Sequence, residues 1–215
     1  MNNIREIAKS LLFRHTTIGK PTYGYQLEPI QLAAIVLGLE AVMQGRTSQA
    51  TIVEIGVARG MTSRFIAEHI RASGYDVRFF CIDTFASFTD EDLRHEETHR
   101  GKSRKDMSWF TYNDYAAWKR NFAGYDFVRP IQADAGRFDY RSIGPIDFCF
   151  LDVDLYRPTL SALEGLWPNM ADRSILMVDD VNEHDPLWDG AHEAFMQFAT
   201  CLLYTSDAAD DLVSV

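Results

Sequence analysis

The stretch TIVEIGVARGMT, residues 51–62, has the pattern of a buried β-strand, a tight glycine turn and the beginning of a helix. β-Branched residues dominate its first half, as is typical of buried strands. Gly56 and Gly60 bracket the turn. Glycine permits a positive φ and lets a ligand lie directly on the backbone, and open α/β sheets bind ligands at the carboxyl ends of their strands. The stretch therefore predicts an α/β fold with a ligand site at this turn.

The residues around the turn indicate which ligand fits it. Glu54 precedes Gly56, and the spacing E-x-G-x-x-x-G differs from the G-x-G-x-x-G of dinucleotide sites. With an acid and without a lysine to hold phosphate, the turn suits a ligand that carries an ammonium group and a ribose. The segment resembles the first motif of class I S-adenosylmethionine methyltransferases. A glycine between a strand and a helix often makes a turn that binds no ligand. Other residues must therefore distinguish a ligand site from a simple turn.

Length and composition predict one globular α/β domain. The 215 residues are 47% hydrophobic and 24% charged, which is ordinary for a soluble protein. We expect a cytoplasmic location, because the chain opens without a secretory signal and has no apolar run long enough to span a membrane. Cys81 and Cys149 lie in apolar runs and are expected to be reduced core cysteines. The net charge of −10 argues against nucleic acid as a partner, since phosphate binding needs a basic patch.

Five apolar runs alternate with amphipathic segments along the chain. Such alternation predicts a doubly wound, mostly parallel sheet with right-handed crossovers. We expect strands over 51–55, 77–82, 127–132, 146–151 and 175–178, and helices over 26–44, 61–72, 112–122, 158–170 and 187–199. The segment 89–107 is dense in charges of both signs, too hydrophilic for the core and too long for an ordinary connection. It is expected to be a lid or a mobile loop.

Residues 201–215, CLLYTSDAADDLVSV, resemble a sequencing adapter translated in frame. The resemblance covers at least ten consecutive residues, which makes a chance match improbable. We therefore expect a single domain over residues 1–200 followed by a non-native tail. The natural chain is then expected to continue past Thr200 into further strands that are absent here. The alternative is a natural amphipathic tail.

Acidic residues stand at or next to the carboxyl ends of four expected strands, at Glu54, Asp83, Asp152 and Asp179. Parallel strands bring these ends to one edge of the sheet, so we expect the acids to converge on one cleft. A carboxylate at Asp83 can accept both hydroxyls of an adenosine ribose, as an acid does in dinucleotide folds. The alternative is that Asp83 caps the following loop. Asp134, after the third strand, is a candidate for contact with adenine, or else a solvated loop acid.

The pairs Asp152/Asp154 and Asp179/Asp180 predict a divalent cation site. Two strands would carry these carboxylates to one place, where bare charges repel and one group must take up a proton. A hard cation such as Mg²⁺ resolves that repulsion, since it prefers oxygen ligands and keeps some water or substrate oxygens. The alternative is that these acids cap helices and end loops in solvent.

Three downstream segments carry a more particular resemblance: FLDVDLYRPTLSAL, ILMVDD and GAHEAF. Together with EIGVARGMTS and DTFASF they are similar to the macrocin O-methyltransferase family, S-adenosylmethionine-dependent enzymes that methylate sugar and polyketide hydroxyls. The resemblance spans residues 51–198 and implies the Rossmann-like fold of class I methyltransferases. Val153 departs from the family pattern, which usually has glycine there. The expected lack of strands six and seven is a second departure.

The resemblance also implies roles for individual residues. Asp152, Asp179 and Asp180 would hold Mg²⁺, and Asp154 would be the general base. S-adenosylmethionine would lie against the strand ends and the turns that follow them, at Glu54, Gly56, Ala58, Gly60, Thr62, Ser63, Asp83, Thr84, Phe85, Asp134 and Asp152.

The function that follows is Mg²⁺-dependent transfer of a methyl group from S-adenosylmethionine to a hydroxyl of a sugar or a glycosylated small molecule. A hydroxyl barely ionises at neutral pH. Coordination to a cation lowers the pKa of a bound water, and a coordinated hydroxyl benefits in the same sense. Asp154 would take the proton while the hydroxyl attacks the methyl group in line. The expected partner is a small-molecule acceptor, and a homodimer is left open. A catechol or phenol O-methyltransferase and a non-catalytic S-adenosylmethionine-binding protein are the alternatives.

Two further patterns admit more than one interpretation. Residues 95–99, HEETH, match the H-E-x-x-H of zinc proteases. Their surroundings lack the apolar face that would bury such a helix, and no clear third ligand follows, so we interpret the segment as part of the charged lid. The aromatic residues that come next are expected either to pack in the core or to wall the acceptor pocket: Trp109, Phe110, Tyr112, Tyr115 and Trp118.

Overall fold

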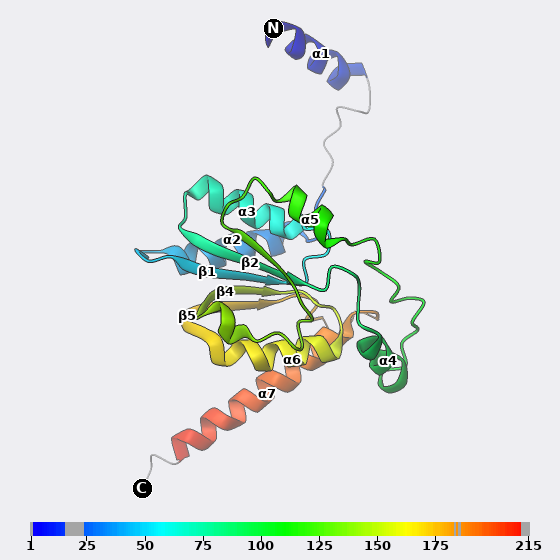
Figure 1. Cartoon of the computed structure of the whole chain (residues 1–215), viewed down its shortest axis with the longest axis vertical. Helices are drawn as coiled ribbons and strands as arrows, with labels where there is room; N and C mark the ends of the chain where they lie inside the picture. Colours follow the sequence, from blue (N-terminus) through cyan, green and yellow to red (C-terminus); the bar gives the residue numbers. More distant parts are fainter. Residues whose placement is uncertain (1, 16–23, 183, 185, 212–215) are drawn as a thin grey trace.

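The computed structural model describes residues 2–15, 24–182, 184 and 186–211. Its centre is a sheet of five parallel strands in the order β3-β2-β1-β4-β5 (Figure 1). The chain runs from β1 outward to β2 and β3 and then returns to the other side of β1 for β4 and β5. This reversal places the carboxyl ends of β1 and β4 side by side, where open α/β sheets bind ligands. The strands are β1 (Ala50–Ile55), β2 (Val77–Asp83), β3 (Val128–Gln132), β4 (Ile146–Leu151) and β5 (Met170–Val178).

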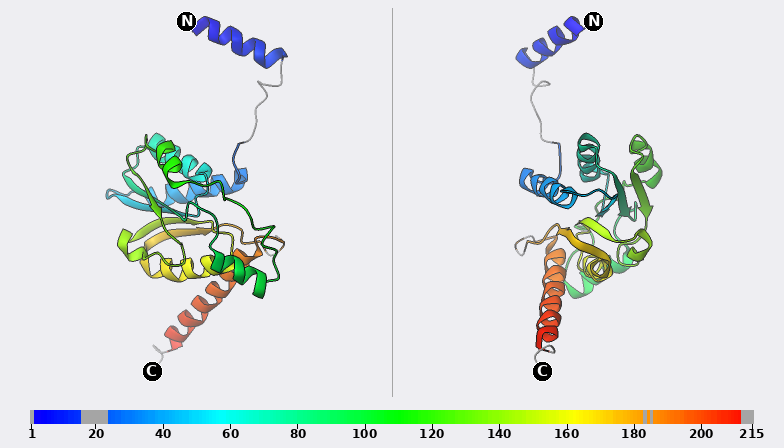
Figure 2. Two further views of the ribbon diagram at one scale, coloured as in Figure 1. Left: turned by 45° about the vertical axis from the view of Figure 1, so that its right-hand side comes forward. Right: turned by 90° about the vertical axis from the view of Figure 1, so that its left-hand side faces the viewer.

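Helices cover both faces of the sheet, as Figure 1 and Figure 2 show. Buried side chains of α2 (Pro29–Met43), α3 (Met61–Ser73) and α5 (Tyr115–Asn121) belong to one core cluster. Those of α6 (Tyr156–Leu166) and α7 (Asp189–Asp211) belong to the other. The doubly wound α/β fold is therefore confirmed. The remaining helical elements of the described chain are α1 (Asn2–His15), α4 (Asp90–His99) and the 3₁₀ turns η1 (Tyr140–Ile143) and η2 (Trp167–Asn169).

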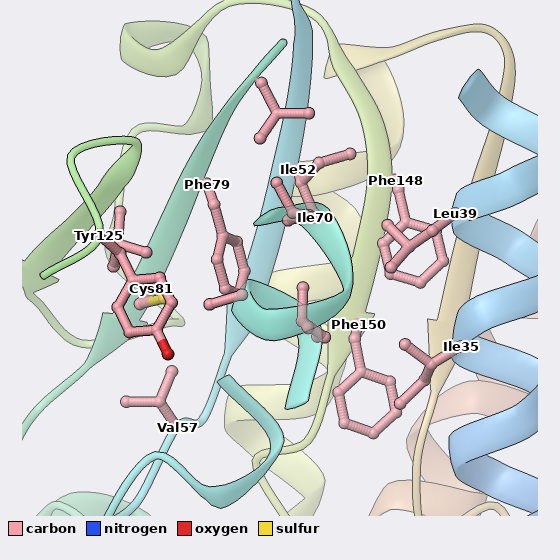
Figure 3. Close-up of a cluster of buried hydrophobic side chains, with 14 of the residues drawn as sticks. Ile35, Leu39, Ile52, Val57, Ile70, Phe79, Cys81, Tyr125, Phe148 and Phe150 are labelled. Atoms are coloured by element: carbon pink, nitrogen blue, oxygen red, sulfur yellow. The ribbon is translucent and has the colours of Figure 1, made fainter. Parts of the chain in front are cut away.

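The core clusters follow from the alternation of side chains along each strand. Phe148 and Phe150 of β4 belong to the cluster that contains α2, whereas the residues that alternate with them belong to the α6 and α7 side. Figure 3 shows Ile35 and Leu39 of α2 lying close to these two phenylalanines. Full burial of a side chain of this size contributes about 1.5–3 kcal/mol. Packing on both faces thus holds the strand ends, and the turns that follow them, in fixed positions.

Local sequence explains the limits of α3, the helix that follows the glycine turn. Gly60 precedes its first residue and Gly74 follows its last, with φ of 87° and 67°. Glycine adopts this left-handed conformation without a side-chain clash. Ile66 and Ile70 lie on the face that packs on the sheet. The strand, turn and helix predicted from residues 51–62 are confirmed.

The segment 89–107 differs from its prediction. It forms helix α4 over Asp90–His99, so the mobile loop, one of the two expectations, is wrong for these residues, while the lid stays a prediction. The hydroxyl oxygen of Thr89 accepts a hydrogen bond from the backbone N–H of Asp92 at 3.2 Å and caps the helix. The segment also contributes to the interior, because Glu96 and Met107 are buried. The polar composition of the segment gave no indication that these two residues face the interior.

Other predicted elements differ in their limits. The helix predicted from residue 112 begins at Tyr115, and β5 begins at Met170 rather than at residue 175. Helix α7 runs continuously to Asp211 and so crosses residue 200, where the domain was predicted to end. The last part of the predicted tail, residues 212–215, lies outside the described residues. Cys81 and Cys149 are buried free thiols, as predicted.

None of the described helices combines the length and the apolar character needed to cross a membrane.

Candidate cofactor and metal site

A cavity of about 300 Å³ lies at the carboxyl edge of the sheet. Its wall includes residues from the turns after all five strands, from the segment before α2, from the start of α4 and from the position before α7. The predicted site residues in this wall are Gly56, Ala58, Asp83, Thr84, Asp134, Asp152, Asp154, Asp179 and Asp180. The convergence of acids predicted from the strand ends is therefore confirmed, except at Glu54.

Gly56 brings the turn after β1 directly against the end of β4. Its φ is 81°, and a Cβ atom at this position would lie 1.6 Å from the carbonyl oxygen of Asp152. Two backbone hydrogen bonds hold the contact: Gly56 N–H donates to Ile82 O at 2.9 Å, and Asp152 N–H donates to Ile55 O at 2.8 Å. Any side chain at this position would displace the end of β4 and the acids that follow it.

Asp83 holds the glycine turn in place. Its Oδ2 accepts hydrogen bonds from the backbone N–H groups of Val57 at 2.8 Å and Ala58 at 3.0 Å. Its Oδ1 accepts from the backbone N–H of Phe85 at 2.6 Å. The carboxylate therefore caps two turns, the alternative interpretation of this residue, while it also lines the cavity. Ionised carboxylates offer about four lone-pair positions. The Thr84 hydroxyl lies 3.4 Å from Oδ1 but donates its one proton to Ser87 O at 2.7 Å, so acceptor capacity is left for a ligand hydroxyl.

Glu54 lies behind the turn and not in the described cavity wall, contrary to its predicted role as a direct ligand contact. The side chain is 1% exposed, within β1. Burial raises the pKa of Glu54 to about 8, with a smaller contribution from the charge of Asp83 in the same direction. The group is therefore largely protonated at neutral pH, and an acid in this state does not attract an ammonium group as an ion would.

Four other predicted contacts also lie outside the described cavity wall: Gly60, Thr62, Ser63 and Phe85. Gly60 has a packing reason, because a Cβ there would lie 2.6 Å from the ring of Phe122 and 2.8 Å from Nε1 of Trp118. Phe85 is buried and its ring lies 5.0 Å from that of Tyr115. The motif as a whole was identified from the sequence, but Gly60 and Phe85 pack against neighbouring aromatic residues and do not line the described cavity.

Three carboxylates meet in the cavity wall, those of Asp152, Asp154 and Asp180. One oxygen of each lies within 4.8 Å of the others, the only such group of three or more potential metal ligands among the described residues. Partial burial raises the pKa of Asp152 and of Asp154 well above the usual range, and the neighbouring carboxylates raise both further. The acids are thus held close together at the cost of mutual repulsion, which a divalent cation would relieve.

Asp179 was predicted as a metal ligand but is not part of this cluster. Its Oδ1 accepts a hydrogen bond from Nε2 of Gln31 at 2.6 Å. Gln31 belongs to the first turn of α2 and also caps that helix, because its Oε1 accepts from the backbone N–H of Glu28 at 2.7 Å. Asp179 therefore connects the end of β5 to α2. No signal in the sequence identified Gln31, since the contact joins segments 148 residues apart.

The backbone at the acid cluster adopts a left-handed conformation. Asp154 has a φ of 61° and Asp180 a φ of 55°, and Ala58 in the glycine turn has a φ of 43°. Residues other than glycine rarely adopt such angles, although aspartate tolerates them better than most. Strained conformations of this kind persist where the surrounding structure enforces them, and they concentrate at functional sites. All three residues line the cavity.

Asp134 and Asp92 form a second acidic region of the wall. Asp134 Oδ1 accepts a hydrogen bond from the backbone N–H of Gly136 at 2.9 Å, so it closes its own turn. Asp92, in the first turn of α4, was not predicted to belong to the site. Partial burial raises its pKa. The pattern Thr89-x-x-Asp92 is a helix-capping signal that could have located α4 and this residue.

Aromatic residues form another part of the cavity wall. Phe88, Phe110 and Trp188 line the cavity, and the ring of Phe88 lies 5.7 Å from that of Phe110 and 5.9 Å from that of Trp188. Trp188 was not identified from the sequence. Of the aromatic run predicted either to pack or to wall a pocket, Phe110 lines the cavity and Trp118 is buried in the core. Core packing is confirmed for Trp118. Trp109 and Tyr112 are exposed and fit neither interpretation, and contact of Phe110 with an acceptor stays a prediction.

The H-E-x-x-H segment does not assemble a zinc site in the described structure. His95 and His99 lie on α4 with stacked rings 4.5 Å apart, but they belong to no cluster of three potential ligands. Glu96 turns away from them into the interior, where its Oε1 accepts a hydrogen bond from the backbone N–H of Tyr156 at 2.9 Å. The acid that would act as the base of a zinc protease therefore faces away from the two histidines, and the helix itself was not expected.

The described cavity wall is strongly acidic. Seven carboxylate side chains line it, and no lysine, arginine or histidine of the described residues does. Such a wall disfavours a ligand with phosphate groups and favours cations or neutral polar molecules.

Comparison with known proteins agrees with this geometry. The family model described as "Methyltransferase domain" matches residues 53–181, more than half of the chain. The fold is similar to that of the O-methyltransferase NovP, with a TM-score of 0.66 and 21% identity over 80% of this chain and 72% of NovP. It is also similar to CalS11, described as a calicheamicin methyltransferase, with a TM-score of 0.59 and 18% identity over 90% of this chain and 76% of CalS11. No curated protein matches the chain.

Proposed function

The chain belongs to the methyltransferase-domain family, and we propose that it transfers a methyl group from S-adenosylmethionine to a hydroxyl of a sugar or a glycosylated small molecule, with Mg²⁺ as a cofactor. One observation carries this proposal: the cluster of Asp152, Asp154 and Asp180 lines the same cavity as the glycine turn and Asp83. A cofactor site and a metal site that share one cavity are what Mg²⁺-assisted methyl transfer requires. NovP and CalS11, which share the fold, are described as an O-methyltransferase and a calicheamicin methyltransferase.

In this proposal the cofactor lies along the turns after β1, β2 and β3. The backbone at Gly56 and Ala58 approaches the cofactor closely, because neither residue carries a large side chain there. The remaining acceptor capacity of Asp83 receives the ribose hydroxyls, and Thr84 lines the same wall. Asp134 and Ala135 lie where the adenine would be held. Glu54, Gly60, Thr62, Ser63 and Phe85 act indirectly, as the support of the turn.

The donor set fits Mg²⁺. Three carboxylates provide hard oxygen ligands from two neighbouring turns. Burial, and after it the neighbouring carboxylates, raise the pKa of Asp152 and of Asp154, and a cation would relieve the repulsion. We assign Asp152 and Asp180 to the metal. Asp179 lines the same cavity and has a second carboxylate oxygen besides the one that Gln31 holds, so it is the candidate for a third ligand. When bound, Mg²⁺ would lower the pKa of a coordinated hydroxyl.

Asp154 is proposed as the general base. A carboxylate with a raised pKa is a stronger base than one with the ordinary value, and the environment of Asp154 raises its pKa. The adjacent acids fix the side of the cavity on which the acceptor hydroxyl is deprotonated. The protein must also hold that hydroxyl in line with the methyl group, since orientation accounts for much of the rate in such transfers. The sulfonium group of the cofactor already supplies a good leaving group.

The aromatic wall of Phe88, Phe110 and Trp188 is proposed to hold the apolar part of the acceptor. Aromatic faces bind apolar ring surfaces, while the carboxylates opposite them receive polar groups. Because the described wall has no basic side chain, we expect a neutral or cationic acceptor rather than one that carries a diphosphate. CalS11 is also described as a TDP-rhamnose 3'-O-methyltransferase, so this expectation distinguishes the present chain from that protein.

A phenol or catechol acceptor is the second candidate. The aromatic wall favours it, because a planar ring could lie against Trp188 while two adjacent hydroxyls reach the acid cluster. The two candidates share the cofactor, the metal and the base, and they differ only in the acceptor.

A methyl-transfer assay with radiolabelled S-adenosylmethionine tests the proposal. The purified chain is incubated with a panel of glycosides and a panel of catechols, in Mg²⁺ and in EDTA. Methylation of glycosides that EDTA abolishes and Mg²⁺ restores is the expected result. Methylation confined to catechols would select the second candidate, and methyl transfer that persists unchanged in EDTA would contradict the role of the metal.

A further inference from the structure

The buried carboxylate of Glu96 contacts the start of the helix that follows the acid cluster. Glu96 is 1% exposed, although it belongs to α4, a helix made almost entirely of polar and charged residues. Its Oε1 accepts a hydrogen bond from the backbone N–H of Tyr156 at 2.9 Å. Tyr156 is the first residue of α6, and Leu155 before it offers no side chain that could cap the helix. Glu96 therefore satisfies an amide that the helix itself leaves without a partner, and its negative charge lies at the positive end of α6.

This contact fixes the position of Asp154. Asp154 precedes Tyr156 by two residues, and the backbone between them is tight, because Leu155 N–H donates to Val153 O at 2.7 Å. The left-handed φ of 61° at Asp154 needs support on both sides. Gly56 supports the turn from the side of β1, and Glu96 supports it from the side of α4.

The partner of Glu96 extends the connection to the start of α7. Arg100 Nε forms an ion pair with Glu96 Oε2 at 2.9 Å, and its terminal nitrogens form ion pairs with Glu193 and, at 3.0 Å, with Asp189. Lys102 Nζ lies 2.6 Å from Asp189 Oδ1 and donates to Pro186 O at 2.8 Å. These contacts hold the start of α7 against α4.

Gly190 shows how closely the three elements approach. A Cβ atom on this residue, in the first turn of α7, would lie 2.7 Å from the backbone nitrogen of Tyr156 and 3.3 Å from Glu96 Oε1. Helix α7 therefore packs directly on the hydrogen bond between Glu96 and α6. The buried pair is the point where α4, α6 and α7 meet.

We propose that Glu96, together with Arg100, is a positioning residue that sets the distance between Asp154 and Asp180. The inference rests on the proposed function, in which these acids bind Mg²⁺ and remove the proton of the acceptor. It gives the HEETH segment a role: its first acid, Glu96, organises a metal site on other elements and does not belong to one formed by the histidines of its own helix.

The experiment compares Mg²⁺ affinity, measured by calorimetry in the presence of S-adenosylhomocysteine, for the full chain and three variants. Glu96→Ala removes both contacts. Glu96→Gln keeps an oxygen for the Tyr156 amide and removes the charge that pairs with Arg100. Glu97→Gln is the matched control, since Glu97 lies next to Glu96 on α4 but pairs with Arg104 on the surface.

We expect Glu96→Ala to weaken Mg²⁺ binding at least about tenfold, the range found when residues that orient metal ligands are removed. Glu96→Gln should recover part of that loss, and Glu97→Gln should bind Mg²⁺ as the parent does. Affinity for S-adenosylhomocysteine should stay within about twofold in all variants, because the glycine turn and Asp83 are not touched.

Hydrogen exchange of the peptide that contains Tyr156 gives a readout without metal. Exchange of this peptide should be faster in Glu96→Ala than in the parent and unchanged in Glu97→Gln. A folded Glu96→Ala variant with parental Mg²⁺ affinity and parental exchange at Tyr156 would overturn the inference alone. A parent chain that binds neither Mg²⁺ nor S-adenosylhomocysteine would overturn the proposed function and the inference together.

Discussion

The backbone of Gly56 lies so close to Asp152 that a Cβ atom on Gly56 would be 1.6 Å from the carbonyl oxygen of Asp152. This contact joins the two halves of the site, the turn after β1 and the acids after β4. The cofactor and the metal are proposed to bind on either side of it. The distance between the methyl donor and the base therefore depends on one residue that has no side chain.

Replacement of that glycine is predicted to damage both halves. Gly56→Ala adds a Cβ against the main chain of Asp152 and also strains the positive φ, which alone costs about 1–2 kcal/mol. We expect a loss of more than about 2 kcal/mol in the free energy of unfolding and a marked loss of S-adenosylhomocysteine affinity. Chemical denaturation and calorimetry measure the two effects. Gly124→Ala is the control, because a Cβ at Gly124 meets no atom within 4 Å; equal effects of both substitutions would refute this explanation.

Asp154→Asn is predicted to separate chemistry from stability. Loss of the general base should lower turnover by about 10²–10⁴-fold. Without Mg²⁺, the variant should unfold at a higher temperature than the parent, because it removes one of the repelling carboxylates, and asparagine tolerates the φ of 61°. Affinity for S-adenosylhomocysteine should not change. Unaltered turnover on an acceptor from the panel would exclude Asp154 as the base.

Glu54 is predicted to make stability depend on pH. Its folded-state pKa of about 8 lies above the ordinary value of 4.5, so the folded chain binds the proton more tightly than the unfolded chain does. That contribution to stability is fully present below pH 4.5, falls as pH rises toward 8 and is lost above it. Glu54→Gln removes the titration, so its stability relative to the parent should rise between pH 5 and pH 9, by up to about 5 kcal/mol.

Thermal unfolding at a series of pH values measures this difference. Glu164→Gln, on the exposed face of α6, serves as the control and should show no trend. If the difference in stability between Glu54→Gln and the parent were the same at every pH, Glu54 would be ionised in the folded chain at neutral pH.

Trp188→Ala is predicted to act on the acceptor alone. The residue lines the cavity, and its ring lies 5.9 Å from that of Phe88. We expect KM for the acceptor to rise about tenfold or more, while S-adenosylhomocysteine affinity stays the same, because a buried aromatic contact at a ligand is worth about 1–3 kcal/mol. Trp167→Ala is the control, because Trp167 contacts Phe198 and lies outside the described cavity wall. An unchanged KM in Trp188→Ala would place the acceptor elsewhere.

The sequence predicted those parts of the fold and site that depend on local pattern. The strand, turn and helix around Gly56 follow from β-branched residues, glycine and helix formers in succession. Asp83, Asp152, Asp154, Asp179 and Asp180 were placed in one cavity because strands that alternate with helices are parallel, and parallel strands end at the same edge. The fold class and the convergence of the acids could therefore be predicted without knowledge of side-chain packing.

Contacts between distant segments could not be predicted in this way. Glu54 and Asp83 both stand near strand ends in the sequence, but the register pairs Glu54 with Cys81, two residues before Asp83. The side chain of Glu54 is therefore buried within β1, and this burial raises its pKa. Gln31 reaches Asp179 across 148 residues of chain. Glu96 belongs to a polar segment and contacts the backbone of Tyr156 only where α4, α6 and α7 meet. Trp188 reaches the cavity wall through its packing on Phe88, 100 residues earlier in the chain.

The central claim is that the cavity binds S-adenosylmethionine at the glycine turn and Asp83. Calorimetric titration of S-adenosylhomocysteine into the purified full chain, with and without Mg²⁺, tests it most directly, after circular dichroism has shown that the chain is folded. We predict binding at micromolar strength that Asp83→Ala weakens at least about tenfold, with Asp83→Asn in between because its amide oxygen can still accept from the turn. A folded chain that takes up no S-adenosylhomocysteine under either condition would contradict the account.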